Sequence, residues 1–338
     1  MRGSLGFNTP RSLLLTSLFL FAFRSGSGSF GDQQKEYKKC LIHCGEAEQC
    51  DKHYFPVRQS VVNKIFGWTC PAECQYQCMW TVEKKNRAAG IRVFQYYGKW
   101  PFTRILGIQE PASVLFSLGN MAAHIYGYHH IYLSGLEDNK AADWFLHGLT
   151  RANYYVSLNA WLWSAVFHSR DVYWTMLLDY SSAIALIFTS LATSICRAFN
   201  VRERRRQQAV IFAIGLYYCR HVYYMTMVNF NFSWNMKIAV GAAGIYLVFF
   251  AAWSLAHIYH GKRRHSQYAL AACLCTLAAC SLEVSDFFPL LSLVDAHALW
   301  HASTIPIIFL WYRFYASDIR YDLGIIPLPL HKRLNNLK

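Results

Sequence analysis

The chain has 338 residues, of which 54% are hydrophobic and only 15% are charged, whereas soluble domains carry roughly 25% charged residues. This deficit argues against an ordinary soluble protein and indicates a protein embedded in a bilayer. The net charge of +14 is not accompanied by a nucleic-acid-binding motif, so we attribute it to basic loops on the cytosolic side of a membrane and predict no nucleic-acid partner.

The first predicted element is a signal peptide over residues 1–24. Arg2 and Arg11 make its start basic, an apolar run follows over residues 13–23, and small residues at 25–29 offer a cleavage site. The apolar run is shorter than the ~20 residues that a membrane-spanning helix needs. A cleaved signal peptide is therefore favoured over a signal anchor.

Residues 25–103 are predicted to form a small luminal domain stabilised by disulfide bonds. An even number of cysteines behind a signal peptide indicates disulfides in an oxidising compartment. Zinc ligation is the alternative, but the cysteine spacing is unlike that of a zinc knuckle. The sequence does not choose among the possible pairings of the six cysteines, which are Cys40, Cys44, Cys50, Cys70, Cys74 and Cys78.

Residues 104–316 are predicted to form a seven-helix transmembrane domain, followed by a cytosolic tail over residues 317–338. Basic residues such as Arg204, Arg205 and Arg206 concentrate in loops that this topology places in the cytosol, as the positive-inside rule requires. The predicted fold is an all-α membrane protein with a luminal N-terminus and a cytosolic C-terminus. The apolar segments of near-span length are 105–132, 145–168, 173–196, 208–229, 237–259, 268–288 and 293–315.

Five polar residues lie near the predicted luminal ends of the second, third and seventh spans. Ser164 and His168 are four residues apart, as are His297 and His301, so each pair shares one helix face. Asp179 lies within the third span. Ionisable residues inside a bilayer are costly and are therefore functional candidates. Three imidazoles with an open fourth position form a common catalytic zinc site, so we predict that His168, His297 and His301 bind Zn2+.

We assign the other two residues, Ser164 and Asp179, to catalysis. In this hypothesis zinc activates a water molecule for hydrolysis. Asp179 accepts a proton or orients a histidine, and Ser164 hydrogen-bonds an oxyanion or acts as a nucleophile. The alternative for each residue is a structural role, because polar side chains within membranes also bond to helix backbone or to each other.

Other polar residues of the spans are weaker candidates. Glu283, Asp286 and Asp295 either support the histidines or lie at the membrane interface. Arg220 and His221 either hold a lipid phosphate or extend towards the membrane surface. Several histidines of the first and fifth spans are expected to meet lipid headgroups, namely His124, His129, His130, His257 and His260.

The pattern of Ser164 with His168, Asp179, and His297 with His301 resembles that of the CREST superfamily of membrane hydrolases, which includes the alkaline ceramidases and the progestin and adiponectin receptors. More specifically, the chain resembles the post-GPI-attachment phospholipase family, whose members remodel the lipid of GPI-anchored proteins. The cysteine-rich domain distinguishes this family from the ceramidases and the receptors, which lack it. Segments that carry the resemblance include 67–70, 98–102, 109–113, 157–161, 167–171 and 295–301.

The resemblance implies a seven-helix fold and zinc-dependent hydrolysis of the unsaturated sn-2 acyl ester in the phosphatidylinositol of GPI-anchored proteins. The five residues above would be the active-site positions. It implies residence in the Golgi membrane, or alternatively in the endoplasmic reticulum. Another lipid amidase or esterase, such as a ceramidase, is an alternative function, and so is a non-catalytic seven-helix receptor or cargo factor. A transporter is disfavoured because no repeated halves are evident.

Overall fold

The computed structural model describes residues 29–325 apart from residues 57, 58, 135 and 137. The predicted signal peptide and most of the predicted tail therefore lie outside the described residues. Within the described part of the chain the regular structure is helical, and the only β-type pairing there consists of isolated bridges. The predicted all-α class is confirmed.

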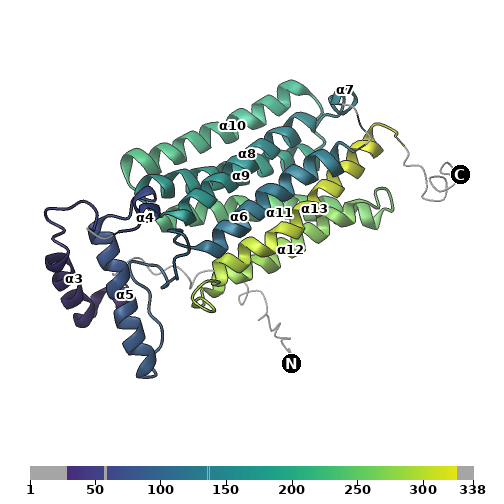
Figure 1. Ribbon diagram of the computed structural model, residues 1–338. Coiled ribbons are helices and arrows are strands. Elements are labelled where there is room, and N and C mark those ends of the chain that lie inside the picture. Colours follow the sequence, from purple (N-terminus) through teal and green to yellow (C-terminus); the bar gives the residue numbers. More distant parts are fainter. Residues whose placement is uncertain (1–28, 57–58, 135, 137, 326–338) are drawn as a thin grey trace, which may run out of the picture.

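Short helices and one longer hairpin form the cysteine-rich region at one end of the molecule (Figure 1). The longest helix of this region begins after Thr69, whose hydroxyl accepts a hydrogen bond from the amide of Ala72, and Pro71 lies in its first turn. Both features favour a helix start. The helices are α2 (Phe30–Gln33), α3 (Lys35–Ala47), α4 (Val61–Ile65) and α5 (Cys70–Ala88).

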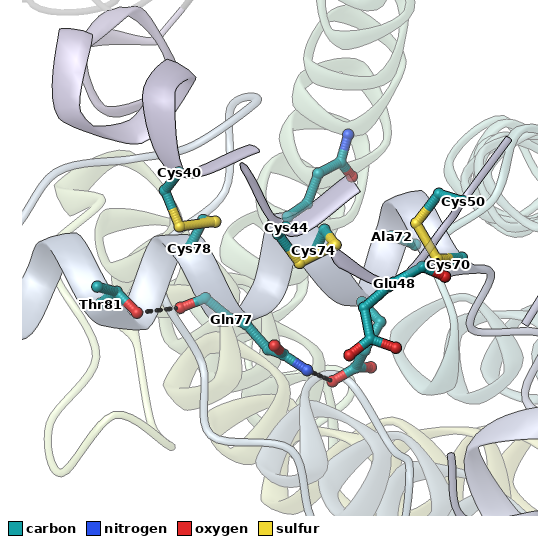
Figure 2. The surroundings of a disulfide bond; sticks show 12 residues. Cys40, Cys44, Glu48, Cys50, Cys70, Ala72, Cys74, Gln77, Cys78 and Thr81 are labelled. Carbon is teal, nitrogen blue, oxygen red and sulfur yellow. Dashed lines mark hydrogen bonds between the residues drawn. A yellow bond between two sulfur atoms is a disulfide. The ribbon is translucent and has the colours of Figure 1, made fainter. Parts of the chain in front are cut away.

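Three disulfide bonds join α3 and the turn after it to α5 (Figure 2): Cys40–Cys78, Cys44–Cys74 and Cys50–Cys70. The cysteines of α5 are spaced by four residues, and so are the two of α3, so each set occupies one helix face. The first cysteine of one helix pairs with the last of the other, as two antiparallel helices require. The disulfide prediction is confirmed over the zinc alternative.

We expect the double substitution Cys40→Ser/Cys78→Ser to destabilise the cysteine-rich region by about 2–5 kcal/mol, as is typical when a native disulfide is lost from a small domain. The bond joins residues 38 positions apart beside a small core that includes Tyr37 and Tyr96. The measurement is the rate of limited proteolysis in this region, with Cys219→Ser, an exposed free thiol, as the control. Equal cleavage rates for the double variant and the wild type would contradict the expectation.

A bundle of long helices follows the cysteine-rich region (Figure 1). Each predicted span overlaps one of its members, and three of these helices, α9, α11 and α12, are long and apolar enough to cross a membrane. The predicted membrane class is thus confirmed. The members are α6 (Pro111–Tyr126) continued by η1 (Gly127–Tyr132), α8 (His147–Ser169), α9 (Tyr173–Ala198), α10 (Arg204–Tyr223) continued by η2 (Tyr224–Val228), α11 (Phe232–Tyr259), α12 (Ser266–Ser285) and α13 (Ala296–Asp322), with the short α7 (Asp138–Ala141) between η1 and α8.

The first and last bundle helices differ from their predicted bounds. The predicted first span starts at residue 105, but α6 starts at Pro111, because Leu106 and Gly107 have positive φ angles in a tight turn that interrupts any helix. The predicted tail starts at residue 317, but α13 continues to Asp322. Its last turns carry acidic side chains that pair with one buried and one half-buried arginine, so they stay packed against the bundle.

The packing of α6 brings together helices that are distant in the chain. α6 contacts both α8 and α13, and α13 also packs along α12. Close approach is possible at Gly127, the first residue of η1, where an added Cβ atom would collide with the ring of Tyr312. As a result, the end of α8 and the start of α13 meet at the end of the bundle that carries the cysteine-rich region (Figure 1).

Candidate metal centre

Three histidines from two helices converge at this end of the bundle. His168 lies in the last turn of α8, and His297 and His301 lie in the first turns of α13. The Nε2 atom of His297 is 2.9 Å from that of His301 and 3.3 Å from that of His168. One nitrogen from each ring can be chosen such that all three lie within 4.8 Å of one another. The three predicted ligands are thus brought together.

Two of the rings are oriented by carboxylates on their far side. The Nδ1 atom of His168 is 2.6 Å from Oε2 of Glu110, and that of His297 is 2.6 Å from Oε2 of Glu283. A carboxylate accepts a hydrogen bond, so Nδ1 carries the proton in both rings. The lone pairs of the Nε2 atoms then face the centre, which is the arrangement of metal-ligating histidines.

The third ring is held by a serine network. Ser117 Oγ lies 3.0 Å from Nδ1 of His301 and also 3.0 Å from Oγ of Ser164. All three side chains are buried. The hydroxyl group of Ser117 therefore connects Ser164 to His301. Ser164 lies on the same face of α8 as His168. No pattern in the sequence marks Ser117, because a lone serine in an apolar helix most often bonds to helix backbone.

Asp179 lies on α9 near the centre and interacts electrostatically with His297. Within the described chain it makes no hydrogen bond and no ion pair, and its side chain is half-buried. The orienting contacts to His168 and His297 come from Glu110 and Glu283 instead. Of the two predicted roles of Asp179, proton acceptor and orienter, the orienting role has no supporting contact.

A lysine from the cysteine-rich region reaches the carboxylate that orients His168. Lys99 Nζ lies 2.6 Å from Oε1 of Glu110 and 2.9 Å from Oδ2 of Asp171. Burial lowers the pKa of Lys99, but the two carboxylates outweigh it and raise the pKa above the ordinary lysine value. Lys99 therefore stays charged. Lys99 lies in the segment 98–102 that carries the family resemblance, but the segment does not show which groups the lysine contacts, and an isolated lysine in a loop is ordinarily solvated.

The three acidic residues predicted near the luminal ends have three different roles. Glu283, at the end of α12, orients His297. Asp295 caps α13, since Oδ1 accepts a hydrogen bond of 2.8 Å from the amide of Ala298. Asp286 accepts a hydrogen bond of 2.8 Å from the indole of Trp100 and so ties the cysteine-rich region to the bundle.

The remaining candidate residues lie away from the metal centre. His221 is buried and bonded to Asn235 at 2.9 Å, whereas the neighbouring Arg220 is exposed. His124 was expected at the membrane surface, but its Nδ1 lies 3.0 Å from the hydroxyl of Tyr312 inside the bundle. The tyrosine hydroxyl gives the imidazole a hydrogen-bond partner inside the bundle, as a buried polar group requires.

The chain matches the profile of the Per1-like family over residues 60–319, a range that contains all residues of the metal centre. The chain belongs to the Per1-like family. The "GPI-specific phospholipase A2-like PGAP3" of Cricetulus griseus is 35% identical over 319 residues, covering 93% of this chain and 96% of the relative. The "Post-GPI attachment to proteins factor 3" of Drosophila melanogaster is 35% identical over 315 residues, covering 90% and 94%.

The human relative, also named "GPI-specific phospholipase A2-like PGAP3", is 33% identical over 302 residues, covering 88% of this chain and 91% of its own. No solved structure matches the chain. The resemblance to the post-GPI-attachment family that the sequence indicates is therefore confirmed over nearly the whole chain.

Proposed function

We propose that this Per1-like protein is a metal-dependent phospholipase A2-type hydrolase that removes the unsaturated sn-2 fatty acid from the lipid of GPI-anchored proteins. The observation that carries the proposal is the convergence of three histidine Nε2 atoms whose Nδ1 atoms are each held from behind. Relatives named GPI-specific phospholipase A2-like match almost the full length of the chain, which supports the same substrate here.

The donor set fits Zn2+, the metal that such sites most often bind. Three neutral imidazoles are a frequent ligand set of catalytic zinc, and carboxylates behind the rings are its usual partners. His168, His297 and His301 would hold the ion. When bound there, zinc would supply the activation of water and the polarisation of the ester carbonyl that hydrolysis at neutral pH requires.

The residues around the histidines supply the remaining functions of an ester hydrolase. The carboxylate of Asp179, which makes no hydrogen bond or ion pair within the described chain, would hold the proton released from the attacking water. The hydroxyl of Ser164 would donate a hydrogen bond to the carbonyl oxygen as negative charge develops on it. Ser117 connects Ser164 to His301 and thus limits how far either side chain can rotate.

We further propose that the metal centre faces the lumen of the Golgi, with the endoplasmic reticulum as the alternative compartment. The centre lies at the same end of the bundle as the three disulfides (Figure 1), and disulfides form in oxidising compartments. The basic loops at the other end agree with a cytosolic position. GPI-anchored proteins face the lumen, so a luminal centre meets their lipid directly from the bilayer.

The test is lipid analysis of GPI-anchored proteins from cells that lack this protein, with and without re-expression of the wild type. We expect an unsaturated sn-2 chain to persist in the deficient cells and to disappear on re-expression. Purified protein is offered ceramide and diacyl-phosphatidylinositol in parallel. Cleavage of ceramide alone would select the ceramidase alternative, and unchanged anchor lipids in deficient cells would contradict the proposal.

A further inference from the structure

Lys99 is held rigidly by the cysteine-rich region. Its backbone closes a tight turn in which the amide of Tyr96 bonds to the carbonyl of Lys99 at 2.8 Å, and the amide of Lys99 bonds back at 3.0 Å. Asp32 accepts a hydrogen bond of 2.9 Å from the amide of Tyr97 within the turn. The ring of Tyr96 is buried beside Tyr37 in the core stabilised by the disulfides. The position of Lys99 therefore depends on the fold of this region.

From this turn a continuous line of contacts leads to the metal centre. The Nζ atom of Lys99 bonds to one oxygen of Glu110 at 2.6 Å, and the other oxygen of Glu110 bonds to Nδ1 of His168 at 2.6 Å. The ammonium group also lies 4.5 Å above the ring of Phe167, next to His168 in the chain. Glu110 and His168 are both almost fully buried.

We propose that Lys99 is a positioning residue through which the cysteine-rich region completes the metal centre. By binding Oε1 of Glu110, Lys99 leaves Oε2 facing His168, so that the imidazole keeps its Nε2 atom turned towards the other two histidines. The ammonium group also compensates the charge of a buried carboxylate, which alone would be costly. This inference rests on the proposed metal-dependent function and adds that the cysteine-rich region is part of the site.

The geometry explains why lysine suits this position. An ammonium group donates in several directions, and Lys99 uses two of them for Glu110 and Asp171, which come from separate parts of the chain. Arginine keeps the charge and the donors, whereas methionine fills a similar volume with neither. Comparison of these two substitutions therefore separates the ionic contact from simple packing.

The experiment measures the zinc affinity of the full-length protein, purified in detergent, by competition with a chromophoric chelator. Loss of a residue that supports a metal ligand typically costs about 10–100-fold in metal affinity, and we expect that loss for Lys99→Met. Lys99→Arg is expected to stay within about threefold of the wild type, because the charge-assisted contact to Glu110 survives. Lys38→Met, which removes an exposed lysine of α3, is the matched control and leaves the affinity unchanged.

A double-mutant cycle with Glu110→Gln tests whether the two residues act as one unit. If they do, the double variant loses about as much affinity as the worse single variant, whereas independent residues lose affinity multiplicatively. If Lys99→Met does not fold, Lys99→Gln is measured instead, and the same loss of zinc affinity is expected. If a folded, uncharged Lys99 variant binds zinc like the wild type, the inference about Lys99 is wrong, while the proposed metal-dependent function is unaffected. A folded wild type that binds no zinc overturns the metal-dependent function and the inference with it.

Discussion

Replacing His301 with alanine is expected to abolish zinc binding and lipid hydrolysis together. The ring is buried, its Nε2 atom lies 2.9 Å from that of His297, and its Nδ1 atom bonds to Ser117. Among the described residues, this cluster of potential metal ligands consists of His168, His297 and His301 alone, with no further histidine, cysteine or carboxylate. The loss of zinc affinity should therefore exceed the roughly 100-fold that removal of an outer-sphere partner can cost.

Two readouts check this expectation. The first is the zinc content of the purified variant, and the second is the sn-2 chain of GPI-anchored proteins in deficient cells that express it. The control is His260→Ala, which removes an exposed histidine at the end of α11. If His301→Ala folds, lacks zinc and still restores removal of the sn-2 chain, the metal-dependent mechanism is contradicted and a receptor or cargo function is favoured.

The convergence of His168, His297 and His301 was predictable because helix periodicity and topology together place them at one end of the bundle. His297 and His301 share a face through their four-residue spacing, and the count of spans puts the end of the second span and the start of the seventh on the same side of the membrane. Glu110 and Lys99 were not predictable in this way. They lie in the irregular segment before α6, where no periodicity relates a side chain to its direction, and their partners come from across the fold.

The disulfides show the same division between local pattern and tertiary geometry. The even number of cysteines predicts disulfides, but the pairing depends on α3 and α5 running antiparallel, which local sequence does not reveal. The end of α13 is a second case. Asp318 and Asp322 read as the start of a solvated tail, yet they are buried against arginines from α9 and from the turn before α12.

Substituting Asp318 with alanine is expected to cause a large loss of stability without direct damage to the metal centre. Asp318 is fully buried and lies at the far end of the bundle from the histidines. Its Oδ1 atom is 2.9 Å from Nη2 of Arg197 and 2.8 Å from Nη1 of Arg263. Removing one member of a buried ion pair typically costs about 3–5 kcal/mol, because the remaining charge is left uncompensated.

The measurement is the thermal unfolding midpoint of the purified protein, with zinc affinity measured at a temperature where the variant stays folded. Glu203→Ala is the control, because its pair with Arg206 is exposed and such pairs contribute little. An unchanged midpoint for Asp318→Ala would show that the charge cluster does not stabilise the bundle.

Asp318→Asn distinguishes charge from shape at the same position. Asparagine keeps the size of the side chain and one acceptor oxygen but not the negative charge that two guanidinium groups share. If charge compensation dominates, as expected for buried ions, the asparagine variant unfolds nearly as early as the alanine variant. If hydrogen bonding and packing dominate, it unfolds close to the wild type, and the extension of α13 beyond residue 316 is then due to shape.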